Sequence, residues 1–126
     1  MSTYQSPRTV SVIAGSAITV YRFVVQATND SKYDHVGTAQ ARMDGISAEG
    51  VGADGNVFGM IVPDGAFVKV EAGATIAVGD LIASDATGKA IVHVSTINNY
   101  IAGVAIRAAA SGDITEIQFL RDRDQA

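Results

Sequence analysis

The chain contains the same short pattern twice. Residues 14–20 (AGSAITV) recur as residues 72–78 (AGATIAV), 58 positions further on, and residues 45–47 (GIS) recur at the same spacing as residues 103–105 (GVA). Two copies are too few for a stacked solenoid, which needs three or more repeats. The repeat therefore predicts two related halves that fold against each other into one pseudo-symmetric domain.

Short apolar runs separated by turn residues indicate that the chain is built from strands. Residues 114–119 (ITEIQF) mix apolar and polar side chains at a period near two, which is typical of a strand with one wet face. Residues 63–65 (PDG) form a turn, because proline presets φ at one corner and glycine accepts a positive φ at the next. Strands are predicted at 9–13, 18–26, 33–36, 57–62, 67–70, 81–83, 90–94, 101–106 and 114–120, and one helical turn at 38–43.

This spacing of strands predicts an all-β fold, a small pseudo-twofold β-sandwich or barrel with little helix. The 126 residues are enough for one ordinary domain. We expect an N-terminal arm and first strand in 1–13, a β domain in 14–120 with halves 14–70 and 71–120, and a charged tail in 121–126.

Composition argues against several classes of protein. Cysteine is absent, which removes disulfides, thiolate chemistry and cysteine metal ligands. The net charge of −4 without a Lys/Arg cluster argues against nucleic-acid binding, which depends on neutralising phosphates. No apolar run approaches the ~18 residues of a membrane span. Because the first ten residues do not resemble a signal peptide, we expect synthesis inside the cell.

The candidate chemical motifs each have a plainer interpretation. Residues 50–55 match GxGxxG but lead into a strand-like segment instead of a helix, which indicates a loop and not a phosphate site. His35 and His93 are 58 residues apart, and Asp34 lies beside the first, but two histidines without cysteine make a closed zinc site improbable. No Gly-x-Ser-x-Gly elbow is present. We therefore predict no catalytic, cofactor-binding or metal-binding residue, and no enzyme.

One alternative concerns Lys89. Residues 78–82 (VGDLI) followed by Lys89 are similar to the modified-lysine hairpin of lipoyl and biotinyl domains, which are also pseudo-twofold β-sandwiches. Gly88 and Ala90 flank this lysine, whereas those domains place an acidic residue or methionine beside it. The pattern therefore favours a plain hairpin turn with an exposed lysine, and a carrier or other β-barrel adaptor domain is kept as the alternative.

The second half of the chain carries a family resemblance. It contains Ala72-Gly73, then 78–82 (VGDLI), 84–92 (SDATGKAIV), 101–105 (IAGVA) and 111–117 (SGDITEI). In this order the segments resemble the small capsid decoration, or cement, proteins of tailed bacteriophages, and the first half resembles them more weakly.

The resemblance implies a structural role without cofactor or catalytic residue. Such proteins bind the outside of the assembled, expanded phage head, commonly as trimers, and reinforce it against the pressure of packed DNA. The implied partner is the major capsid protein, the implied assembly is a homotrimer, and the implied location is the outer surface of the virion capsid after synthesis in the host cytoplasm. A tail or shell adaptor without a decoration role is a further alternative.

Two sets of contact residues follow from this interpretation. We expect the polar N-terminal arm to order against capsid subunits, through Ser2, Thr3, Tyr4, Gln5, Ser6, Pro7 and Arg8. We expect the trimer interface among apolar residues between Gly50 and Phe67, namely Val51, Val57, Phe58, Met60 and Phe67.

Overall fold

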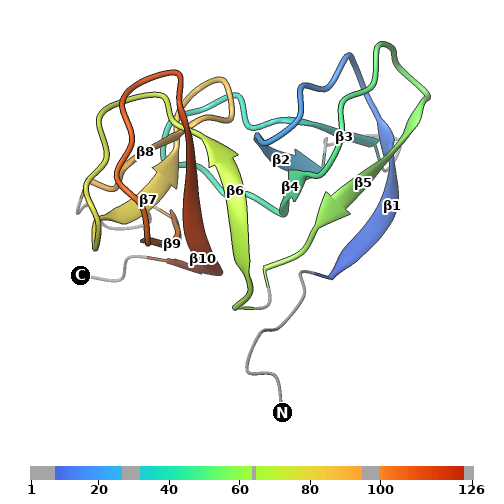
Figure 1. The fold of residues 1–126 in the computed structure, drawn as a ribbon. Helices are drawn as coiled ribbons and strands as arrows, with labels where there is room; N and C mark the ends of the chain where they lie inside the picture. The colour runs from blue at the N-terminus through green and yellow to red at the C-terminus, as the bar shows by residue number, and fades with distance from the viewer. Residues whose placement is uncertain (1–7, 27–31, 64, 95–99, 124–126) are drawn as a thin grey trace.

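The protein is built from two five-stranded β-sheets, and the residues that the structure describes contain no helix (Figure 1). The computed structural model describes residues 8–26, 32–63, 65–94 and 100–123, with 121–123 as backbone only. The first sheet contains β1 (Thr9–Ala14), β2 (Phe23–Gln26), β3 (Lys32–His35), β4 (Gly45–Ser47) and β5 (Val57–Ile61). The second contains β6 (Phe67–Glu71), β7 (Leu81–Ser84), β8 (Ala90–Val92), β9 (Tyr100–Ala105) and β10 (Ile114–Arg123). The all-β fold expected from the sequence is confirmed.

The first sheet closes into a small barrel with the order β1-β3-β2-β4-β5. β1 pairs antiparallel with β5 along its length and parallel with β3 at Ile13 and Ala14. The second sheet has the order β6-β10-β9-β7-β8, and a single parallel bridge from Ala72 to Ala90 links its two edges. Both halves therefore use the same sequence of pairings, and we call the second sheet, which is closed only by this one bridge, the second barrel.

The 58-residue repeat in sequence is a repeat in structure. An isolated antiparallel bridge joins Ile18 to Val51 in the first half, and its counterpart joins Ile76 to Ala109. In register, β1, β2 and β4 match β6, β7 and β9 at a spacing of 58, whereas β3 matches β8 and β5 matches β10 at a spacing of 57. The sequence repeat therefore records shared backbone hydrogen bonding as well as shared composition.

The boundary between the sheets lies between β5 and β6. β6 pairs with β10, so residues 67–70 belong to the second sheet, although the sequence had suggested them for the first half. Figure 1 shows the two groups of strands side by side, with β6 at their border. One apolar core crosses this border, because buried Phe23, Val36, Met43 and Ile46 pack with the interior of the second half. A second cluster, around Val24 and Phe58, fills the first barrel.

Two predicted segments differ from the sequence-based expectation. β2 begins only at Phe23 instead of at 18, because Tyr21 adopts a positive φ of 62° and turns the chain. The helical turn expected at 38–43 is absent, and Gln40 adopts a φ of 64°. Gln40 donates its N–H to the carbonyl of Ser84 at 2.8 Å and accepts from the N–H of Tyr100 at 3.0 Å. Contacts with the second half therefore override local helix preference in this segment.

Glycine is required where neighbouring strands meet most closely. A Cβ atom built on Gly103 in β9 collides with the backbone carbonyl oxygen of Gln118 in β10. At the equivalent position in the first half, a Cβ on Gly45 collides with Met60 Cγ and lies 2.6 Å from the carbonyl oxygen of Ile61. The repeated glycine at 45 and 103 thus allows the neighbouring strands β4 and β5, and β9 and β10, to pack closely.

We predict that Gly103→Ala lowers the free energy of unfolding by about 3 kcal/mol, the upper end for overpacking, because the obstructing atom is backbone. Urea unfolding followed by circular dichroism measures the change. Gly52→Ala is the matched control, because nothing lies within 4 Å of its added Cβ. Equal stability of the two variants would contradict the requirement for glycine where β9 and β10 meet.

Candidate assembly site

The two barrels are joined by a short segment of the first half, Tyr21–Phe23. The N–H of Glu71 in β6 donates to the carbonyl of Tyr21 at 2.8 Å. The N–H of Phe23 donates to the carbonyl of Gly88, in the turn between β7 and β8, at 2.7 Å. The segment therefore lies between β6 and the β7–β8 turn and hydrogen-bonds to both.

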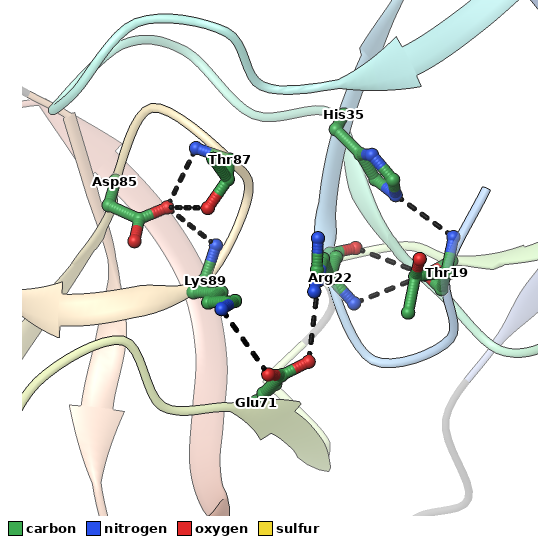
Figure 2. Close-up of polar contacts among 8 residues, drawn as sticks. Thr19, Arg22, His35, Glu71, Asp85, Thr87 and Lys89 are labelled. Atoms are coloured by element: carbon green, nitrogen blue, oxygen red, sulfur yellow. Dashed lines mark hydrogen bonds and ion pairs between the residues drawn. The ribbon is translucent and has the colours of Figure 1, made fainter. Parts of the chain in front are cut away.

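A three-residue ion cluster lies across the same joint (Figure 2). Arg22 Nε lies 3.3 Å from Glu71 Oε1, and Lys89 Nζ lies 3.6 Å from Glu71 Oε2. The Arg22 and Glu71 side chains are only 19% and 20% exposed, so this pair is less screened by solvent than a surface pair. The carboxylate of Glu71 thus connects a cation from each half.

The β7–β8 turn that receives Phe23 is held by Asp85. Its Oδ1 atom accepts hydrogen bonds from the N–H of Thr87 at 2.8 Å, the hydroxyl of Thr87 at 2.9 Å and the N–H of Lys89 at 2.9 Å (Figure 2). Lys89 was expected to be an exposed lysine of a plain hairpin. The hairpin is present, but the ammonium group is engaged by Glu71 and the side chain is 31% exposed. A carrier hairpin presents its lysine to a modifying enzyme, so this geometry gives the carrier alternative no support.

Side chains of the first half fix the segment that enters the joint. Ser47 Oγ donates to the carbonyl of Thr19 at 2.6 Å and accepts from the N–H of Arg22 at 3.1 Å. The N–H of Thr19 donates to Nε2 of His35 at 3.0 Å. Burial and then the charge of Arg22 lower the pKa of His35, which favours the neutral ring that can accept this bond. These contacts were not predicted from the sequence. The only sequence signal near them was the segment at 45–47, which recurs at 103–105.

Aromatic packing completes the joint. Phe23 is fully buried, and its ring lies 6.0 Å from the ring of Phe119 at an interplanar angle of 50°. Burying such a side chain contributes roughly 1.5–3 kcal/mol, and a tilted aromatic pair adds about 0.5–1.5 kcal/mol. The joint therefore combines apolar burial with directional hydrogen bonds, which favours a fixed relation between the barrels.

The predicted arm residues lie mostly outside the described part of the chain. Ser2 to Pro7 are not described, and the structure begins at Arg8, which is exposed. The carbonyl of Arg8 accepts from the N–H of Val62 at 2.9 Å. The root of the arm is therefore anchored beside the end of β5.

The five residues proposed for a trimer interface are not equivalent in the structure. Phe58 and Met60 are 0% and 4% exposed, because alternate residues of β5 point into the first barrel. Val51 is half-buried beside Ile18. Val57 and Phe67 are 61% and 48% exposed. The expectation for Phe58 and Met60 is corrected to a core role, and the interface remains a proposal for the exposed positions.

The residues considered for metal or phosphate binding form no such site in the described part of the chain. No group of three His, Asp or Glu side chains there is arranged to hold a metal ion. His35 instead accepts the Thr19 hydrogen bond described above. The GxGxxG segment at 50–55 is a loop that leads into β5, as predicted.

We predict that Gly88→Ala weakens the joint. Gly88 has a φ of +85°, and an added Cβ lies 2.7 Å from the carbonyl oxygen of Phe23. Gly112→Ala is the matched control, because Gly112 has a φ of +93° but nothing within 4 Å of its Cβ. Both variants carry the backbone strain, so Gly88→Ala should lose about 1–3 kcal/mol more in urea unfolding. Equal losses would show that the joint tolerates the collision.

Comparison with known proteins gives this geometry a context. A model of the phage cement protein family matches residues 3–119. Among solved structures, the chain is similar to one described as the crystal structure of head fiber gp8.5 N base in bacteriophage phi29, with a TM-score of 0.73 and 21% sequence identity. That similarity covers 96% of this chain and 98% of the other, and at this identity it shows a shared fold. No curated protein matches the chain.

The membrane question has a simple structural answer. Within the described ranges, no helix has the length and apolar character needed to cross a bilayer.

The family match and the fold agree with the resemblance seen in residues 72–117. Because the family model spans nearly the whole sequence, the chain belongs to the phage cement protein family.

Proposed function

We propose that this protein is a capsid decoration protein that binds the outside of an assembled phage head and stabilises it against internal DNA pressure. The observation that carries the proposal is the family match over residues 3–119, nearly the whole chain. The role is mechanical and needs no cofactor. Its partner is the major capsid protein, and its location is the outer surface of the virion.

The joint between the barrels supports a mechanical role. A protein that resists expansion of a shell must transmit force between its contact points without yielding. Here the two barrels share an apolar core around Phe23 and four backbone hydrogen bonds across the border, two at Tyr21–Phe23 and two at Gln40. Interiors packed in this way have low compressibility. The double barrel is therefore suited to act as one stiff body.

Stabilisation of the head is tested by heating. We expect DNA-filled heads that lack the protein to release DNA at a lower temperature than heads to which purified protein has been added back. A dye that fluoresces on released DNA reports the transition. Identical release temperatures, at saturating bound protein, would contradict the stabilising role.

The N-terminal arm is our proposed capsid contact. Residues 1–7 precede the exposed and anchored Arg8, so seven residues at roughly 3.3 Å each can reach about 20 Å from the barrel. We predict that deleting residues 2–8 abolishes co-sedimentation with expanded heads and leaves the circular dichroism spectrum unchanged. Removing residues 124–126 is the control for truncation at a terminus. Full binding by the arm deletion would reject this assignment.

We also propose a homotrimer, because three equivalent contacts raise the overall affinity for a shell by roughly 10²–10⁴ without new kinds of contact. Native mass spectrometry at micromolar concentration should give three times the chain mass of 13.0 kDa. A monomer under these conditions would contradict the trimer, while the head-binding experiments above test decoration separately.

A further inference from the structure

The repeat allows each surface of one half to be compared with the same surface of the other. In the first half, Phe23, Ile46 and Ile61 are register partners across β2, β4 and β5. We call these three residues the first outer row. Leu81, Val104 and Gln118 are the equivalent register partners across β7, β9 and β10, and we call them the second outer row.

The two rows differ sharply in burial. Phe23 and Ile46 are 0% exposed, because the first outer row packs against the second barrel. In the second outer row Leu81 is 45% exposed and Val104 is half-buried. The neighbouring Phe67, which pairs with Gln118, is 48% exposed. The second half thus presents to solvent the surface that the first half uses to bind a barrel.

Flanking positions repeat this contrast. Val36 is 1% exposed, and its equivalent is His93, because Val36 donates its N–H to the carbonyl of Phe23 as His93 does to that of Leu81; His93 is half-buried. Met43 is 0% exposed, whereas its equivalent Ile101 is half-buried. Leu81, Val104 and Ile101 keep the apolar character of Phe23, Ile46 and Met43, whereas polar Gln118 and His93 replace Ile61 and Val36. An apolar surface that is kept but not covered within one chain is a candidate interface.

The receiving surface is also duplicated. In the second half, Val68 and Phe119 are 4% and 0% exposed within the shared core. Their equivalents in the first half are Val10, which is 38% exposed, and Val62, which is half-buried. Beside them lie Ile13 and its cross-strand partner Val57, at 43% and 61% exposed. Val57 borders this surface without belonging to it, because its equivalent Ile114 is 40% exposed beside the joint. We call Val10, Ile13 and Val62 the first receiving face.

The joint within the chain is therefore head-to-tail and not two-fold. The segment 21–23 contacts Glu71 and Gly88, whereas a two-fold joint would also bury the equivalent Leu81 and Ile13. Head-to-tail contacts leave one free surface of each kind, and they form closed rings when the rotation allows it. The free surfaces here are the second outer row and the first receiving face.

We propose that the second outer row of one copy binds the first receiving face of the next copy, so that the intermolecular seam repeats the geometry of the joint inside the chain. The occupant of each surface is a second copy of this protein, and the proposal rests on the homotrimer proposed above. Three copies joined in this way form a ring of six related barrels. Val57 and Phe67 then flank the seam, one on each side.

The seam differs from the joint in its electrostatics. Asp80 and Ile13 stand where Arg22 and Glu71 form an ion pair inside the chain. The intermolecular contact therefore lacks that pair and relies on apolar burial. We expect the trimer to be insensitive to salt between low and high ionic strength, since exposed ion pairs are the contacts that salt screens.

The absence of cysteine makes a cross-linking test specific. Phe23 and Phe119, whose rings are 6.0 Å apart, correspond to Leu81 and Val62. We expect the double variant Leu81→Cys/Val62→Cys to form covalent trimers on mild oxidation, seen on a non-reducing denaturing gel. Each single variant should stay at the monomer position, because the proposed seam places Leu81 of one copy beside Val62 of the next and not beside another Leu81.

A substitution provides a second measurement. Leu81→Asp should convert the trimer to a monomer in native mass spectrometry and leave the melting temperature of the monomer unchanged, because the side chain is exposed in the isolated chain. Ile106→Asp is the matched control. Ile106 is 38% exposed, and its first-half equivalent Ala48 also remains exposed, so the joint geometry does not cover this position.

The outcomes separate this seam from the homotrimer itself. A wild-type trimer that persists in Leu81→Asp, with no cross-link in the double variant, would overturn the seam and leave the homotrimer standing. Self-cross-linking of Leu81→Cys alone would overturn head-to-tail geometry in favour of a two-fold contact. A wild-type monomer would overturn both.

Discussion

The burial of Phe23 between the two barrels is the interaction on which the rest of the structure depends. It places the first half over the open side of the second barrel, where β6 and β8 are linked by a single bridge at Ala72 and Ala90. Without this contact the second barrel would expose Val68 and Phe119 at that opening. The two halves are related in sequence, but the second completes its core only with help from the first.

The turn at residue 21 recurs at Gly79, with a φ of 91°, so it belongs to the repeated unit, and the joint uses the groups that it exposes. A continuous strand from 18 to 26 would keep the backbone of Tyr21 and Phe23 within its own sheet. The positive φ of Tyr21 turns these groups outward, and the Ser47 hydroxyl satisfies the N–H of Arg22 that the turn leaves. Such a backbone conformation costs of order 1–3 kcal/mol, which the joint offsets.

The sequence predicted the parts of the fold that depend on local pattern. The repeat, the all-β class and nine of the strand positions follow from turn residues and apolar alternation, although β2 starts later than predicted, and the small residues at 45 and 103 have a steric cause. It missed β4 at Gly45–Ser47, because three residues carry too little periodicity. It also placed Phe58 and Met60 at an interface, because apolar character alone does not reveal which face of a strand points inward. The joint could not be predicted from the sequence, because equivalent residues such as Phe23 and Leu81 are both large and apolar. They differ only in what covers them in the folded protein.

Duplication followed by head-to-tail docking has a structural consequence that a two-fold docking lacks. A two-fold pair consumes both copies of each binding surface and closes upon itself. A head-to-tail pair buries the outer row of one half and the receiving face of the other. The second outer row and the first receiving face stay uncovered, so covering these apolar surfaces requires another chain. In the proposed seam, the apolar residues Leu81 and Val104 are covered by the next copy, which gives their apolar character a function in assembly. A protein that gains affinity by binding a shell at several equivalent points must assemble from several copies. The contact that joins the two barrels inside one chain can also join neighbouring copies when its surfaces recur at the outer edges of the chain.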